Sequence, residues 1–173
     1  MSQYTDLQER ARRVVEAGAA LVETKLFGLQ ARHQAFPAGE GEILLSDLAL
    51  RLENSATAET MLAYVLVLQT QVLQVTDGED EPAVLADLEV AYGARYVLSD
   101  GVGELSSDEV RAFGFSIAAM ALWPYIRATV SHTIAEMNLA FSALIPTITQ
   151  AELAAAAGAE AEDLASPGSL PPA

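Results

Sequence analysis

Three consecutive stretches decide the fold of this chain: TMLAYVLVLQTQVLQV at 60–75, DGEDEP at 77–82 and AVLADLEVAYGARYVL at 83–98. The first is apolar at nearly every position before it becomes mixed, which is typical of a strand buried on both faces. The second is rich in turn-forming residues. In the third, Leu88 and Val90 alternate with Asp87 and Glu89, as in a strand buried on one face. Together they predict a long antiparallel hairpin.

Two more strands are predicted upstream of this hairpin. Residues 43–53, ILLSDLALRLE, place leucines on one face and charged side chains mostly on the other. Residues 21–34 show no helical stripe and are predicted to form a strand with a bulge at Gly28. Pro37, Gly39 and Gly41 mark the loop between the two. Four strands with short connections predict an antiparallel meander.

Helical periodicity appears on both sides of the sheet region. Residues 5–20 are predicted to form an N-terminal helix, and residues 108–122 a second helix that Trp123-Pro124 interrupts or kinks. The helix is expected to resume at Pro124, because the apolar stripe continues from there, and a weak alanine-rich helix is predicted over 148–158.

The order of strands and helices predicts an α+β fold, in which one antiparallel sheet carries helices on one face. We expect a single domain over residues 1–158 and a disordered acidic tail over 159–173. One short helix cannot cover two long strands on both faces, so self-association is the simplest way to bury the rest.

Composition limits the possible functions. The 173 residues include no cysteine, carry a net charge of -15 and are 51% hydrophobic. Nearly all the negative charge lies beyond residue 33, so the body repels nucleic acid phosphates and anionic membranes. The sequence contains no apolar run of the roughly 18 residues that a membrane span needs, and residues 1–18 do not resemble a secretory signal. These features favour a cytoplasmic protein without nucleic acid or membrane partners.

The residues that catalysis or metal binding would need are scattered. His33 and His132 lie on different predicted elements and outside any metal-ligand spacing. The acidic turn at 77–81 lacks the twelve-residue calcium loop and is expected to be solvated. There is no nucleotide-binding glycine motif and no nucleophile elbow. We therefore predict a protein that is not an enzyme and needs no cofactor.

The most informative cluster is ALWPYIR at 121–127, which holds the single tryptophan. Two interpretations stay open for Leu122, Trp123 and Tyr125. They form an aromatic core beneath a helix kink, or they line an adaptable apolar surface that binds a polypeptide.

The run LWPYIR, followed by a helix, by Asn138-Leu139 and by an apolar stretch to Pro146, resembles the carboxyl-terminal part of the SecB family of chaperones. The resemblance extends along residues 21–146. It implies a homotetramer, built as a dimer of dimers, that holds unfolded polypeptides or preproteins in apolar grooves without ATP. It further implies that the groove walls include the following residues: Phe36, Ile43, Leu45, Ile148 and Leu153.

The sequence departs from export SecB in ways that bear on its partners. Export members contact the SecA motor through acidic side chains on the first strand, whereas residues 25–30 here read KLFGLQ. Asp77 and Glu79, in the turn before the last strand, are the acidic residues that could contact SecA instead. The N-terminal helix is similar to that of SecB-like chaperones that protect an antitoxin.

Three hypotheses result. The first is an ATP-independent holdase, for export or for a dedicated antitoxin. The second is a non-catalytic structural or assembly protein that uses its sheet and helices only for self-association. The third is a small-molecule binder or an enzyme that uses the region of Trp123 and Tyr125 as a pocket.

Overall fold

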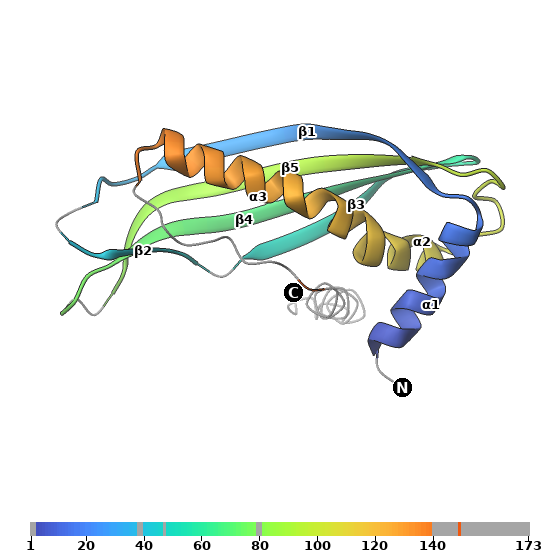
Figure 1. Cartoon of the computed structure of the whole chain (residues 1–173), viewed down its shortest axis with the longest axis horizontal. Coiled ribbons are helices and arrows are strands. Elements are labelled where there is room, and N and C mark those ends of the chain that lie inside the picture. The colour runs from blue at the N-terminus through green and yellow to red at the C-terminus, as the bar shows by residue number, and fades with distance from the viewer. Residues whose placement is uncertain (1–2, 38–39, 47, 79–80, 140–148, 150–173) are drawn as a thin grey trace, which may run out of the picture.

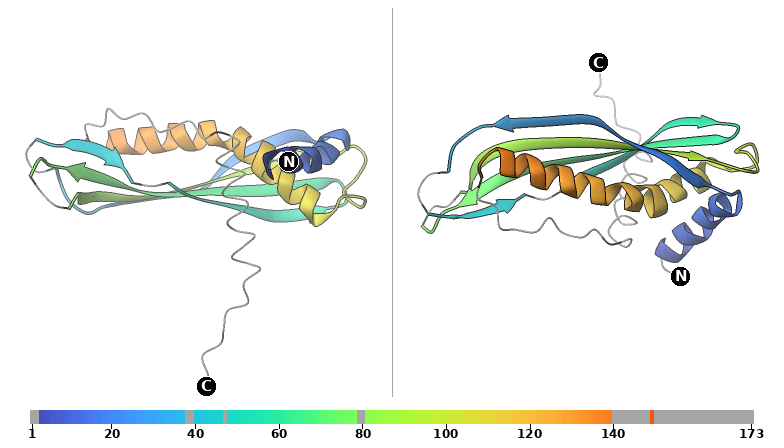
Figure 2. Two further views of the ribbon diagram at one scale, coloured as in Figure 1. Left: turned by 90° about the horizontal axis from the view of Figure 1, so that it is seen from below. Right: turned by 45° about the horizontal axis from the view of Figure 1, so that its top comes forward.

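The computed structural model describes residues 3–37, 40–46, 48–78, 81–139 and 149. It has an α+β fold in which a twisted antiparallel sheet carries a long helix on one face (Figures 1 and 2). This fold class is the predicted one. The elements are α1 (Gln3–Glu16), β1 (Ala20–His33), β2 (Glu42–Leu45), β3 (Ala49–Ala58), β4 (Met61–Val75), β5 (Ala83–Val97), α2 (Ser107–Phe113), a π-helical turn (Gly114–Ala118) and α3 (Ala119–Glu136).

The strand order differs from the predicted meander. β3, β4 and β5 do follow one another as hairpins, but β1 pairs with β5, so the order is β1-β5-β4 with β2 and β3 both on the far edge of β4. This is a Greek-key connection. Residues 34–41 connect β1 to β2. At the start of this connection, the Gln34 amide donates to Leu85 O, near the beginning of β5, at 2.8 Å. Eight residues reach up to about 26 Å, and three strand spacings need about 14 Å.

The strand predicted over 43–53 is divided into β2 and β3. Ser46 lies at the division and remains tied to β4, since its amide donates to Gln71 O at 2.9 Å and its hydroxyl accepts from the Gln71 amide at 2.9 Å. The two short strands therefore share one side of β4. The bulge predicted at Gly28 occurs one residue earlier, where Phe27 falls between the paired residues Leu26 and Gly28.

The core lies between the sheet and the helices. Every second residue of β4 is buried, and Leu62, Tyr64, Leu66 and Leu68 are at most 1% exposed. The predicted helical stripe meets this face: Ile126, Val130 and Ile134 of α3 are fully or almost fully buried. This pattern arises because alternate strand positions and every third or fourth helix position face the same layer.

Pro124 does not interrupt the helix, although interruption was one of the two outcomes that the sequence predicted. It is the sixth residue of α3, exposed, and the helix continues to Glu136. Only the bond to the carbonyl four residues back is lost, and α3 retains its buried face. The irregularity lies upstream instead, in the π-helical turn Gly114–Ala118.

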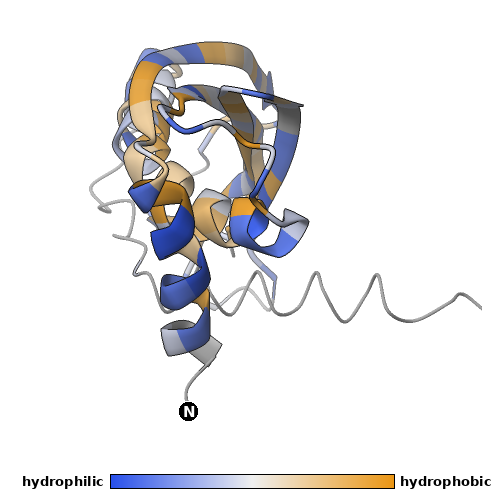
Figure 3. Ribbon diagram, turned by 90° about the vertical axis from the view of Figure 1, so that its right-hand side faces the viewer, coloured by the Kyte–Doolittle hydropathy of each residue, from blue (hydrophilic) through white to orange (hydrophobic). Residues whose placement is uncertain are grey.

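α1 is an amphipathic helix docked on α2. Its polar face is plain in Figure 3, while Ala11 and Val14 are buried. Arg10 pairs with Asp108 at 3.1 Å, and Arg13 pairs with Glu109 at 3.6 Å. The predicted N-terminal helix is therefore present, and ion pairs join it to α2. Among the described residues, no helix has the length and apolar character needed to cross a membrane.

Candidate functional site

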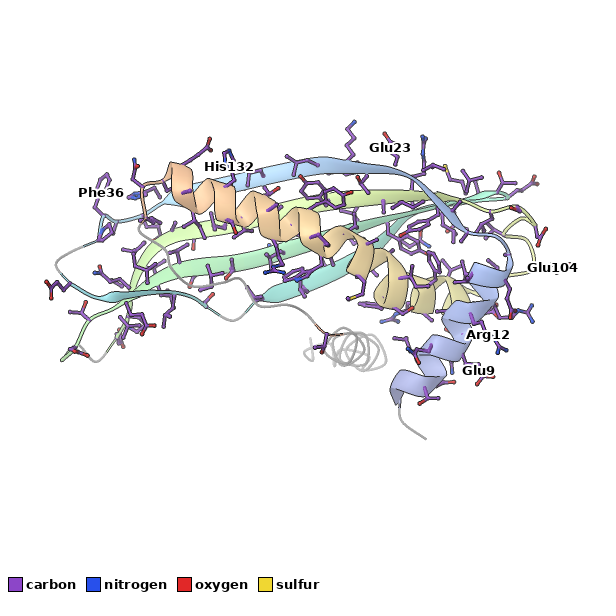
Figure 4. The ribbon with its side chains drawn as sticks, viewed as in Figure 1. Glu9, Arg12, Glu23, Phe36, Glu104 and His132 are labelled. Carbon is purple, nitrogen blue, oxygen red and sulfur yellow. The ribbon has the colours of Figure 1, made fainter. Side chains whose placement is uncertain are left out.

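The residues predicted to line a groove near the loop after β1 lie at one end of the molecule. Phe36 is 81% exposed beside this loop, with its ring centroid 4.5 Å from that of His33 (Figure 4). Ile43 and Leu45 are half-buried in β2 and pack against the core from the helix-covered side. Of these three side chains, Phe36 is exposed, whereas Ile43 and Leu45 are partly covered by the core.

The residues of the 121–127 cluster separate into two groups. Leu122 is fully buried and Trp123 is 3% exposed, so both belong to the core in this structure. Tyr125 is 45% exposed and stacks on Tyr92, with ring centroids 5.8 Å apart. Tyr92 in turn shares a hydrogen bond of 3.1 Å with Thr129. Of Leu122, Trp123 and Tyr125, only Tyr125 is exposed.

The remaining predicted residues are only partly described. Asp77 is exposed in the turn between β4 and β5. Glu79, Ile148 and Leu153 lie outside the described residues, as do the helix predicted over 148–158 and the tail over 159–173. Within the described part of the chain, no group of three or more metal-ligating side chains has a geometry that could hold a metal ion.

β1 carries the largest group of exposed apolar side chains, and none of them was among the predicted site residues. This strand pairs only on one side, with β5, so its other edge is open within the described structure. Long, apolar edge strands are templates for pairing with another chain. The sequence indicates this exposure in residues 21–29, where apolar side chains occur at both odd and even positions and so lie on both faces of the strand. The exposed ones are Leu21, Val22, Leu26, Phe27 and Leu29.

The sheet face away from α3 has an aromatic centre. The Phe27 ring, 64% exposed, lies over Gly93, where a Cβ would come within 2.1 Å of it. Lys25 lies 5.9 Å from the centroid of the same ring, and Arg95 pairs with Glu23 at 3.1 Å. Gly93 is therefore needed for this close approach.

One end of the same face is polar. Asp87 accepts hydrogen bonds from the side chains of Gln71, at 2.8 Å, and Gln34. These two bonds, that of Gln71 first, lower the pKa of Asp87 below its usual value. Gln69 donates to Glu89 at 2.5 Å. The side chains satisfy one another, so this region is a structural network rather than a set of free catalytic groups.

An apolar pocket opens on the helix-covered side, between β3 and α2. Its walls come from the sheet, from the loop after β5 and from the start of the helical layer. Tyr64 lies in its floor, and the Tyr64 hydroxyl donates to Val110 O at 2.8 Å. The lining residues are Leu52, Asn54, Thr57, Tyr64, Val102, Leu105, Ser107, Val110, Arg111 and Phe115.

Comparison with known proteins gives one informative similarity. The structure matches a SecB-like chaperone of Mycobacterium tuberculosis, solved in complex with a ChAD peptide from the HigA1 antitoxin, with a TM-score of 0.64 and 18% identity over 84% of this chain and 99% of that one. A protein of unknown function from Streptococcus agalactiae matches with a TM-score of only 0.39 and 11% identity, over 75% and 97% of the two chains. No protein-family model and no curated protein matches the sequence. With its antiparallel sheet, its long covering helix and its N-terminal helix, this chain has the SecB-like fold.

Proposed function

We propose that this protein is a chaperone that holds non-native polypeptides without ATP. The observation that carries the proposal is the amount of bulky apolar surface left exposed on a strongly acidic chain. The side chains from 41% to 81% exposed are Val15, Leu21, Val22, Leu26, Phe27, Leu29, Phe36, Val75, Val97 and Tyr125. Exposed apolar area of this kind marks interaction surfaces, and the SecB-like fold supports a polypeptide as the partner.

The proposed client surface starts at the loop after β1. Phe36 projects from it, and Ile43 and Leu45 continue it along β2; Ile148 and Leu153 complete the groove in this proposal. Tyr125 adds an exposed aromatic side chain on α3. Apolar burial at about 25 cal/mol per Å² would supply the affinity, and the net charge of -15 would attract basic unfolded segments.

Self-association is the second part of the proposal. The open edge of β1 suits pairing with β1 of a second copy, which would continue the sheet across a two-fold axis and satisfy the free backbone groups of this edge. Two such dimers joined through their helical layers would make a homotetramer. A purely structural assembly protein is the rival function, because it needs the same edge but no client.

Two roles follow from one binding activity. In export, Asp77 and Glu79 would meet SecA; in a dedicated role, the client would be an antitoxin. The acid-free stretch at 25–30 and the docked helix α1 favour the dedicated role. Polypeptides that copurify with the protein distinguish the two: a single antitoxin supports the dedicated role, and a mixture of preproteins supports export.

The chaperone activity is tested by light scattering. An unfolded test protein diluted from denaturant should aggregate less in the presence of the purified protein, with no nucleotide added. Phe36→Ser should weaken this protection. Val15→Ser should leave it unchanged, because Val15 is an exposed apolar side chain of α1 that lies outside the proposed client surface. No protection at about tenfold excess would contradict the proposal and favour the structural rival.

A further inference from the structure

We propose that the acidic segment 160–164, EAEDL, docks on the sheet face away from α3 in the same chain. The docking surface lies on β1 and β5 and is called the Phe27 patch. Its residues are Glu23, Lys25, Phe27, Gly93 and Arg95. This contact goes beyond the proposed function and is independent of it, because the occupant is a segment of the chain itself and not a client.

The strand register brings the residues of the Phe27 patch together on one face. Glu23, labelled in Figure 4, pairs with Arg95, and Lys25 pairs with Gly93. Side chains two positions apart in a strand share a face. The Phe27 ring lies over Gly93 and is 64% exposed. The patch therefore has an aromatic centre with charged side chains at its rim.

A hollow lies beside the Phe27 ring. Gly93 has no side chain, and Ala63 of β4, which pairs with Arg95, has a short one. The longer side chains around them leave a space of about 250 Å³. Since a cavity of about 150 Å³ can hold benzene, this space has room for one leucine side chain. Filling it would remove apolar surface of the ring and of the occupant from water.

The charge of the patch differs from that of the whole chain. The chain carries a net charge of -15, whereas the patch holds two basic side chains and one acidic one. Arg95 is paired with Glu23 at 3.1 Å. Lys25 is exposed and has no ion pair among the described residues; its ammonium lies 5.9 Å from the centroid of the Phe27 ring. An occupant that carries a carboxylate beside an apolar side chain therefore fits the patch.

The end of the chain contains a segment of this kind. Beyond Arg127 the sequence has no lysine or arginine, and its densest acidic run is the segment 160–164. Leu164 directly follows Asp163 in this run. In the proposed contact, Leu164 fills the hollow beside the Phe27 ring, and the Asp163 carboxylate pairs with the Lys25 ammonium.

The chain is long enough for this contact. Thr149 is the last described residue, and the roughly eleven residue steps from it to Glu160 span up to about 36 Å. Four neighbouring strands are about 14 Å across, and sheet layers pack about 10 Å apart. A segment of this length can therefore pass round the edge of the sheet. Tethering also gives the segment an effective concentration in the millimolar range at the patch, so a weak contact is enough to populate the docked state.

The chain has no cysteine, so disulfide crosslinking in the full-length protein tests the contact directly. Ala63→Cys lies at the hollow, and Ala165→Cys follows Leu164. Under mild oxidation this pair should form an internal disulfide at least about tenfold faster than Ala49→Cys with Ala165→Cys, because docking raises the effective concentration only at the patch. Ala49 is exposed on the same face of the sheet, in β3, and lies outside the patch.

Substitutions within the patch identify the groups that hold the segment. Phe27→Ser and Lys25→Gln should each slow crosslinking of the 63–165 pair to the rate of the control pair. Their matched controls are Val75→Ser and Arg32→Gln, which remove an exposed apolar side chain and a positive charge from the same face outside the patch. These controls should leave the rate unchanged.

A non-reducing gel separates the outcomes, since an internal disulfide changes the mobility of the single chain and a disulfide between chains doubles the mass. Equal rates for the two cysteine pairs, a disulfide between chains, or equal rates in Phe27→Ser and Val75→Ser would overturn the contact. If the 63–165 pair does not crosslink but the protein binds an added EAEDL peptide at the patch, the occupant is a separate acidic partner, and docking of the chain's own segment is overturned.

Discussion

The Tyr64 hydroxyl joins the sheet to the helical layer through its bond to Val110 O. Burial, and then the neighbouring Tyr96, raises the pKa of Tyr64, and burial raises the pKa of Tyr96 to about 12. Both phenols are favoured in their neutral form in the folded state. Their contribution to stability is therefore complete below pH 10 and is lost as the pH rises through the raised values.

Tyr64→Phe should lower the free energy of unfolding by about 1 kcal/mol, because it removes one buried hydrogen bond. It should also reduce the loss of stability above pH 10. Denaturant unfolding at pH 7 and at pH 11 checks both effects. Tyr125→Phe is the control, since Tyr125 is 45% exposed; an equal loss in both variants would contradict the role assigned to Tyr64.

Ser106 caps α2 in a reciprocal arrangement. Its hydroxyl accepts from the Glu109 amide at 3.2 Å, and its own amide donates to Glu109 Oε2 at 2.7 Å. The bond from the Ser106 amide is the main reason that the pKa of Glu109 is lowered. A lowered pKa means that this contribution is present above the usual carboxylate range and is lost as the pH falls through the folded value.

Ser106→Ala should destabilise the protein by about 1 kcal/mol, as for other lost N-caps. The Ser106 hydroxyl also donates to Glu109 Oε2 at 3.0 Å and is the second cause of the lowered pKa of Glu109. The variant loses this bond but keeps that of the amide, so it should lose somewhat less stability than the wild type on acidification from pH 6 to pH 3. Thermal unfolding across this range is the measurement, with Ser107→Ala as a neighbouring exposed control. Equal thermal stability of Ser106→Ala and Ser107→Ala would contradict the role assigned to the cap.

At the scale of elements, the π-helical turn sets how closely the helical layer approaches the sheet. It contains Gly114, where a Cβ would lie 2.8 Å from both Leu52 Cδ2 and Tyr64 Cε1. Tyr64 is 1% exposed, and its hydrogen bond to Val110 O holds the ring in place. The glycine thus lets the backbone of the turn contact two core side chains directly.

Gly114→Ala should destabilise the protein by about 1 kcal/mol net, because overpacking of about 1–3 kcal/mol exceeds the gain of up to about 1 kcal/mol in helix propensity. Gly103→Ala is the matched control, since a Cβ there meets nothing within 4 Å. Equilibrium unfolding compares the two. Stabilisation by Gly114→Ala would show that the turn can relax away from Tyr64.

At the scale of the whole molecule, the open edge of β1 predicts the assembly. Leu26→Lys with Leu29→Lys introduces charge at two exposed apolar positions of this edge. Edge lysines oppose strand pairing, so the double variant should form a smaller oligomer than the wild type. Sedimentation velocity measures this change, and Val15→Lys on α1 is the control. An unchanged mass would remove β1 from the proposed interface.

The sequence by itself determined the antiparallel hairpin over 60–98, the α+β class and the buried stripe from Ile126 to Ile134. These features follow from local periodicity, because positions two apart in a strand or three to four apart in a helix share a face. The resemblance carried by LWPYIR then pointed to the fold that the structure has.

Only the tertiary structure decided which strands are neighbours and which apolar residues are free. Alternation assigns a residue to a face but does not name the strand beside it, so β1 was placed next to the wrong partner. Leu122, Trp123 and Tyr125 have similar apolar character in the sequence, yet the first two are core and the third is exposed. Exposure depends on packing between distant segments, and only the folded chain brings β3, the loop after β5 and α2 together around one pocket.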